Sequence, residues 1–268
     1  MSNDYHMTPS ELRSVQLIQL ELLCEVDRIC RKCGLSYRII AGTLLGAVRH
    51  GGFIPWDDDT DIAMMRDDYE KMFAILDAEF CRDGFFYVRG DVTRIWYKDT
   101  PAQVDVFPID VGYSETPPAG AEYDAFIAKL NRIKESVRLD YGLIKKQLAP
   151  TPAGDIEAAL AARDRDLVGK RAENGFLFYG AESLVKNRCV FSHDDVFPLK
   201  PVEFLGIKTY IPNNTEYWLY MQYGDYGTLP QGPFPKHWDI RGRLNPGSYK
   251  ECQKLIAAYY PKGAKCGQ

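Results

Sequence analysis

The stretch Trp56-Asp57-Asp58-Asp59-Thr60-Asp61-Ile62-Ala63-Met64 is the most informative part of the sequence, because four carboxylates fall within five positions and an apolar segment follows. We expect a strand over residues 59–64, in which every second side chain lies on one face. The odd-numbered aspartates are therefore predicted to point to one face, and Asp58 to the other. Clustered carboxylates repel one another, so a fold that holds them together usually supplies a cation.

Hard divalent ions such as Mg²⁺ prefer carboxylate oxygens and often act together with a substrate phosphate. We therefore predict a metal-dependent phosphoryl- or nucleotidyl-transfer site that uses Asp59 and Asp61. The alternative is a solvated acidic turn that caps a helix, and a run of aspartates on its own favours that alternative. Two further features of the sequence favour the transfer site.

The first feature is Gly42-Thr43, which follows an expected strand (37–41) and precedes an expected short helix (44–49). Glycine lets the backbone approach a phosphate, and a helix N-terminus offers N–H groups with a partial positive charge. Thr43 adds a hydroxyl group. Turns of this kind are common, so this signal is weak on its own.

The second feature is Asp105, which lies between Val104 and Val106 in an expected strand over residues 103–110. A charge within an apolar strand costs free energy unless it is paired or bound to a metal. Asp105 could therefore complete a metal site with Asp59 and Asp61, or form a salt bridge with an arginine or lysine. As part of the site it could also accept the proton of an incoming hydroxyl group as a general base.

Composition excludes several functional classes. The chain has 268 residues, of which 46% are hydrophobic, and this supports a full core. A net charge of −4 argues against a nucleic-acid partner. We expect no transmembrane segment and no signal peptide. The odd count of seven cysteines predicts reduced thiols and a cytoplasmic location. The sequence has no nucleophile elbow, HExxH or Walker A motif, which argues against hydrolases and ATPases.

Hydrophobic periodicity and turn residues predict the other elements. A capping box at Thr8-Pro9-Ser10-Glu11 begins a helix that ends near Gly34 and packs on the sheet. The remaining expectations are strands over 85–88 and 94–97, Pro108 at a strand end or an edge, a hairpin over 204–211, and helices from residue 67, over most of 122–171 and over 215–223.

The sequence also resembles the LicD family. The resemblance is carried by the block Ala41–His50, the block Gly52–Ile62, Val104-Asp105-Val106-Phe107-Pro108-Ile109-Asp110, and Tyr223-Gly224-Asp225-Tyr226 with Leu229-Pro230. It implies an α+β fold with a nucleotidyltransferase-like small mixed sheet flanked by helices. It also implies one domain over 1–268, with a catalytic core at about 36–112 and a family-matching part at about 190–240. The sequence departs from the family in the helical insert expected at about 120–180.

In function, the resemblance implies an enzyme that transfers a phospho-alcohol, with phosphocholine first, from a CDP-linked donor such as CDP-choline to a hydroxyl of a cell-surface glycan or glycan precursor, and that releases CMP. Fukutin-related proteins, which use CDP-ribitol, are similar. The alternatives are a nucleotidyltransferase that uses an NTP and releases pyrophosphate, or a non-catalytic nucleotide-binding protein of the pathway. The acceptor could be lipid-linked, and the protein could be peripheral at the inner face of the membrane.

The resemblance also suggests roles for single residues. Asp59, Asp61 and Asp105 would be catalytic and hold Mg²⁺ or Mn²⁺. The residues expected to contact the donor are Gly42, Thr43, Arg49, Arg66 and His237. Each of the two arginines has an ion pair as its alternative role, and the histidine has a surface position as its alternative. The role of Asp110 stays open, and neither the head group nor the acceptor sugar follows from the motifs.

Overall fold

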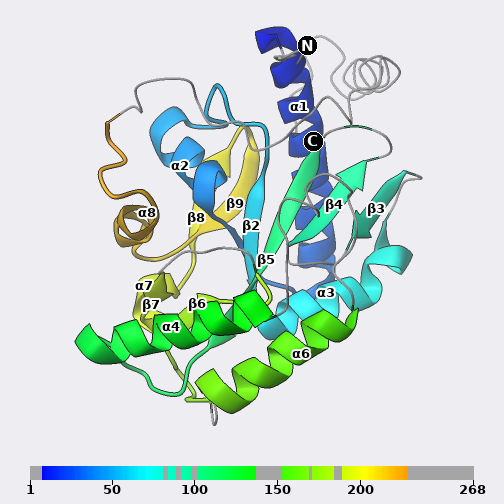
Figure 1. Cartoon of the computed structure of the whole chain (residues 1–268). Coiled ribbons are helices and arrows are strands. Elements are labelled where there is room, and N and C mark those ends of the chain that lie inside the picture. Colours follow the sequence, from blue (N-terminus) through cyan, green and yellow to red (C-terminus); the bar gives the residue numbers. More distant parts are fainter. Residues whose placement is uncertain are drawn as a thin grey trace, which may run out of the picture.

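A mixed sheet forms the centre of the computed structural model (Figure 1), which describes residues 8–80, 84–88, 92–97, 100, 102–136, 153–168, 171–183 and 189–228. The described elements are, in chain order, α1 (Pro9–Cys33), β1 (Tyr37–Ile39), α2 (Ala41–His50), β2 (Asp61–Met65), α3 (Arg66–Glu79), β3 (Phe85–Val88), β4 (Thr93–Tyr97), β5 (Gln103–Val111), α4 (Gly120–Ser136), α6 (Ala153–Arg163), the π-helical segment η1 (Asp164–Val168), β6 (Leu177–Tyr179), β7 (Val190–Phe191), α7 (His193–Val196), β8 (Lys200–Phe204), β9 (Ile207–Ile211) and α8 (Thr215–Tyr223).

The sheet has the strand order β1-β2-β5-β4-β3, and β6 and β7 extend it from β5. Strands β2 and β5 are parallel, whereas the other neighbouring pairs are antiparallel. In the parallel pair, Asp61 lies opposite Asp105. Helices flank the sheet, so the predicted α+β class is confirmed. Among the described helices, none combines the length and the apolar character that crossing a bilayer requires.

Helix α1 begins and ends as its sequence predicts. The Thr8 hydroxyl accepts from the Glu11 amide, and the Glu11 carboxylate accepts from the Thr8 amide, which completes the capping box. Gly34 ends the helix in the left-handed conformation with φ 66°. The apolar side of α1 is fully buried at Leu22, Leu23 and Val26. The helix therefore packs on the sheet, as expected.

Two contacts show which face of the sheet α1 and α3 cover. The Tyr37 hydroxyl of β1 donates to Asp27 of α1, and the hydroxyls of Thr93 in β4 and Tyr69 in α3 are hydrogen-bonded to each other. Side chains alternate along a strand, so the neighbours of Tyr37 and Thr93 point to the opposite face. Asp61 and Asp105 follow that alternation, and they therefore lie on the face turned away from α1 and α3.

The position of Pro108 differs from the prediction of a strand end or an edge. Pro108 lies within β5, opposite Met64 of β2. The amide of Asp105 donates toward β2, to Thr60 O, so alternation directs the Pro108 nitrogen to the other side of β5. On that side, the pairing of β5 with β4 stops at Val106, and its pairing with β6 starts at Ile109. A proline costs no ladder hydrogen bond at such a junction.

The region expected as a helical insert at 120–180 is helical only in part. Helices α4 and α6 lie side by side (Figure 1) and share a second apolar core with η1, in which Phe126, Leu130 and Phe178 are buried. Residues Leu177–Tyr179, however, form strand β6 against the end of β5. A segment of three residues is too short for its hydrophobic periodicity to distinguish a buried strand from the end of a helix, so this part of the prediction was wrong.

The C-terminal hairpin and helix were predicted, but the hairpin starts earlier than expected. Strand β8 begins at Lys200 rather than at Phe204, and Leu205 and Gly206 in the turn both have positive φ, of 50° and 89°. Two positive φ values are typical of the type I′ turn, which matches the twist of the strands. Helix α8 occupies residues 215–223, as expected. Leu205 packs closely on Gly52, because a Cβ added to Gly52 would lie 2.7 Å from Leu205 Cδ2.

Candidate active site

Three aspartates meet where β2 and β5 begin. Asp59, Asp61 and Asp105, which we call the aspartate triad, each offer a carboxylate oxygen, and these oxygens lie within 4.8 Å of one another. The parallel register brings Asp61 beside Asp105, and the Asp105 amide donates to Thr60 O at 2.7 Å. All three side chains are buried. The structure thus brings together three residues that are 46 positions apart at most (105 − 59).

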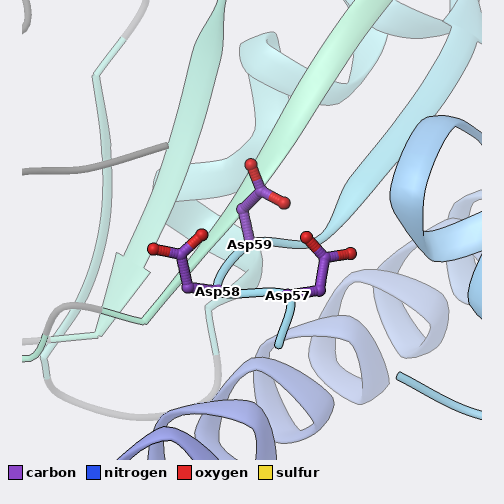
Figure 2. A group of neighbouring side chains, drawn as sticks. All are labelled: Asp57, Asp58 and Asp59. Atoms are coloured by element: carbon purple, nitrogen blue, oxygen red, sulfur yellow. The ribbon is translucent and has the colours of Figure 1, made fainter. Parts of the chain in front are cut away.

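Residues 57–60, which we call the acidic loop, are not part of a strand, because β2 begins only at Asp61. The prediction of alternating faces for these residues was therefore wrong. Figure 2 shows that the carboxylates of Asp57, Asp58 and Asp59 all leave the loop on one side. One oxygen from each lies within 4.8 Å of the others, so Asp59 belongs both to this group and to the triad. Without strand geometry, nothing forces neighbouring side chains apart.

Two side chains of helix α1 bind the backbone of the acidic loop and of the residues just before it. The side-chain amide of Gln16 donates to Ile54 O at 3.2 Å and to Asp57 O at 3.0 Å. The side-chain amide of Gln19 donates to Asp58 O at 2.6 Å. Both glutamines are buried, and a buried loop needs such partners for its carbonyl groups. Sequence reasoning missed these two residues, although two glutamines within the apolar stripe of a helix are a usable signal.

Gly42 and Thr43 lie in the first turn of α2, since this helix begins at Ala41 rather than at residue 44. The Thr43 hydroxyl oxygen accepts from the Asp61 amide at 2.8 Å. A Cβ on Gly42 would lie 2.4 Å from Asp57 Oδ2. Both residues therefore help to place the carboxylates, through a hydrogen bond and through a close approach. Contact of this turn with a donor phosphate stays a prediction.

The backbone at the start of α2 is strained. Ala41 has a φ of 48°, in the left-handed region that residues other than glycine rarely adopt. Strain of this kind costs about 1–3 kcal/mol and persists where the surroundings enforce it, often at functional sites. Here the Ile40 amide is fixed by Asp61 O at 3.1 Å, directly beside the triad. The turn that leads into α2 is thus tied to the strand that carries Asp61.

Arg66 is enclosed by carboxylates on the other side of the sheet. Its guanidinium donates to both oxygens of Asp110, at 2.8 and 3.0 Å, and to Glu182 Oε2 at 2.9 Å. Arg163 of α6 also donates to Asp110, at 2.9 Å. This buried network favours the ion-pair alternative for Arg66 over a contact with the donor. It also gives Asp110, whose role the sequence left open, two arginine partners.

Arg49 and His237 are the remaining residues that the sequence predicted to contact the donor. The Arg49 Nη1 donates to Tyr226 O at 3.0 Å, which ties α2 to the chain that follows α8. Helix α8 itself also packs on α2. His237 lies outside the described residues.

The carboxylates repel one another strongly in the absence of a cation. Burial raises the pKa of Asp61 well above its ordinary value, and the charges of Asp59, Asp105 and Asp57 raise it further. The guanidinium of Arg94 opposes this effect. Arg94 lies on β4 directly opposite Asp105, and its Nε is 3.7 Å from Asp105 Oδ1. Sequence reasoning allowed an unnamed arginine beside Asp105, but it did not identify Arg94.

Comparison with known families agrees with this geometry. Residues 34–125 match a family model described as LicD/FKTN/FKRP, nucleotidyltransferase domain. The matched region runs from just before β1 into α4, so it contains α2, the acidic loop and the whole triad. The resemblance of the sequence to the LicD family is thus confirmed for this domain.

Two relatives illustrate the similarity. The chain is 48% identical over 60 residues to the lipopolysaccharide cholinephosphotransferase LicD of Haemophilus influenzae. The matched segment covers 22% of this chain and 23% of that protein. It is 33% identical over 88 residues to the ribitol 5-phosphate transferase FKRP of Homo sapiens, which covers 30% of this chain and 18% of that protein. The chain thus spans less than a quarter of the length of each relative.

Proposed function

We propose that this protein is a phosphotransferase that moves a phospho-alcohol from a CDP-linked donor to a hydroxyl group of a cell-surface glycan or a lipid-linked glycan precursor. The observation that carries the proposal is the meeting of Asp59, Asp61 and Asp105 within 4.8 Å, inside a domain that matches the LicD family. Phosphocholine is the first candidate cargo, because a relative that is 48% identical over its matched segment is a cholinephosphotransferase. Ribitol phosphate is the second.

The triad fits a divalent metal ion. Its donors are carboxylate oxygens, which are the ligands that Mg²⁺ and Mn²⁺ prefer. The three carboxylates are buried with few nearby positive charges among the described residues, and a cation offsets the repulsion that raises the pKa of Asp61. When bound there, the ion would supply charge stabilisation to the phosphoryl oxygens of the donor.

The residues of the chain itself account for the remaining chemistry. The acceptor hydroxyl oxygen forms a bond to the phosphorus distal to cytidine, and the bond from that phosphorus to the CMP oxygen breaks. Asp105 is proposed to take the hydroxyl proton as general base. The first turn of α2, with Gly42 and Thr43, is proposed to face the negative diphosphate, because a helix N-terminus attracts anions. Thr43 also fixes Asp61 through its amide.

The test uses purified protein with CDP-choline, CDP-ribitol or CTP, each with and without Mn²⁺. A nucleotide that binds the folded state raises the thermal unfolding midpoint. We expect a Mn²⁺-dependent increase with a CDP-alcohol, and CMP release when a glycan acceptor is added. Pyrophosphate release from CTP would instead identify a nucleotidyltransferase, and binding without turnover would indicate a non-catalytic protein.

A matched pair of variants tests the role of the triad. Asp61→Asn removes one charge from the buried cluster and is expected to abolish the Mn²⁺-dependent increase. Asp67→Asn makes the same chemical change at an exposed position on α3 and is expected to keep it. If Asp61→Asn and Asp67→Asn respond to Mn²⁺ alike, the proposed metal site is wrong.

A further inference from the structure

Three charged side chains form one lateral row across the sheet. Asp61 on β2 lies opposite Asp105 on β5, and Asp105 lies opposite Arg94 on β4. Residues that are directly opposite in neighbouring strands project to the same face. The row therefore places a guanidinium beside the triad, on the face of the sheet turned away from α1 and α3.

Arg94 is held in this place from two directions. Its Nε lies 3.7 Å from Asp105 Oδ1, and its Nη1 donates to Val92 O at 3.3 Å. The side chains of Arg94 and Asp105 are only 10% and 7% exposed. The interaction is thus screened from solvent much less than an ion pair on the surface.

Asp105 needs such a partner because of its other neighbours. Two carboxylates of the triad lie close to it on one side, and their like charges push the Asp105 side chain away. The Arg94 guanidinium lies on the other side, so its attraction holds the repelled carboxylate in one orientation and offsets the like charges of the triad. Carboxylates that bind metal are commonly oriented by a neighbouring group, and loss of that group typically costs about 10-fold to 100-fold in metal affinity or activity.

The two arginines that the sequence suggested for the site are engaged elsewhere. Arg66 is enclosed by Asp110 and Glu182, and Arg49 donates to Tyr226 O. Among these three arginines, only Arg94 forms an ion pair with a member of the triad.

We propose that Arg94 is a positioning residue that holds the Asp105 carboxylate in the orientation required for metal binding and catalysis. The proposal rests on the proposed function, since it assigns a partner to one of the predicted metal ligands. Arg94 acts through Asp105, so its effect depends on the presence of that carboxylate.

The experiment measures Mn²⁺ affinity of the purified chain by electron paramagnetic resonance. Arg94→Gln is expected to weaken Mn²⁺ binding by about 10-fold to 100-fold. Arg94→Lys keeps the charge but cannot reach both Asp105 and Val92 O with one ammonium group, so a smaller loss is expected. Arg165→Gln changes an exposed arginine that pairs only with its neighbour Asp166 in the described structure, and it is expected to bind Mn²⁺ as the unmodified protein does.

A double-mutant cycle separates positioning from a general structural role. In an Asp105→Asn background, Arg94→Gln is expected to change Mn²⁺ affinity by less than about 2-fold, because the carboxylate that it positions is absent. An equal loss in both backgrounds would show that Arg94 does not act through Asp105. The thermal unfolding midpoint of each variant checks that the protein is folded, and Arg94→Lys carries the test if Arg94→Gln does not fold.

The two proposals fail in different ways. If the unmodified protein does not bind Mn²⁺, the proposed metal-dependent function is wrong and the role of Arg94 falls with it. If the unmodified protein binds Mn²⁺ and both Arg94 variants bind it equally well, only the role of Arg94 is wrong.

Discussion

The close approach of Gly42 to Asp57 leads to a prediction for Gly42→Ala. A Cβ at this position would lie 2.4 Å from Asp57 Oδ2 and 3.2 Å from its Cγ. Ordinary contact begins at 3.4 Å, so the carboxylate oxygen must retreat by about 1 Å (3.4 − 2.4). Asp57 is buried and lies in the acidic loop, and its retreat changes the separation of the carboxylates around it.

Two opposing effects set the magnitude. Replacing glycine by alanine in a helix stabilises it by up to about 1 kcal/mol. Overpacking a buried position costs about 1–3 kcal/mol. The net change for Gly42→Ala is therefore a loss of about 0–3 kcal/mol, and the displaced carboxylate also weakens metal binding.

The matched control is Gly154→Ala in α6. Gly154 and Gly42 are each the second residue of their helix, but a Cβ on Gly154 would have no atom of the described residues within 4 Å. This control is expected to gain up to about 1 kcal/mol. The two variants should therefore differ by about 1–3 kcal/mol, or about 2–12 °C in thermal unfolding midpoint at about 2–4 °C per kcal/mol.

The assay is thermal unfolding of both variants with and without Mn²⁺. We expect Gly42→Ala to unfold at a lower temperature than Gly154→Ala and to show a smaller increase on addition of Mn²⁺. Equal unfolding midpoints for the two variants, together with an unchanged response to Mn²⁺, would refute the argument from close approach.

Two further predictions concern buried carboxylates. Asp110→Asn leaves Arg66 and Arg163 without a charged partner at that position and is expected to cost about 3–5 kcal/mol by denaturant unfolding, whereas Asp164→Asn, at a site 57% exposed, should cost less than about 1 kcal/mol. Burial raises the pKa of Asp110, but the two arginines outweigh this effect and hold the pKa below its ordinary value. The stabilisation that Asp110 contributes is therefore present above its unfolded-state pKa and is lost as pH falls through its folded-state pKa. The pKa of Asp61 is instead raised, by burial and then by its neighbours, so the stability that its protonation supplies is complete below the unfolded-state pKa and is lost as pH rises through the folded-state pKa. Mn²⁺ requires the ionised carboxylate, so the increase in unfolding midpoint that it causes should grow as pH rises through the folded-state pKa of Asp61, and an increase that shrinks as pH rises would contradict this reasoning.

Local patterns in the sequence predicted the elements well. The capping box at Thr8 and Glu11, the left-handed Gly34 and helix α8 each depend on residues a few positions apart. The hairpin of β8 and β9 likewise depends on a short turn. Hydrogen bonds within a turn or a cap are fixed by neighbours in the chain, and they are therefore visible in the sequence.

The candidate site was predictable only as a set of residue types. Asp59, Asp61 and Asp105 were named from carboxylate spacing and from a charge within an apolar strand, and the structure places them together. The prediction of a strand from residue 59 was wrong, since β2 begins at Asp61. Gln16 and Gln19 of α1 bind the carbonyl groups of Asp57 and Asp58, and these partners lie about 40 residues away, beyond the reach of a local pattern.

The helix caps, the hairpin turn and the run of carboxylates over residues 57–61 could be read from the sequence, because each depends on side chains near one another along the chain. The fold was needed to see that Arg94 lies beside Asp105 and that Arg66 is enclosed by Asp110 and Glu182. These pairings follow from strand register and from the docking of α3 on the sheet, and both are set by the packing of many distant residues at once.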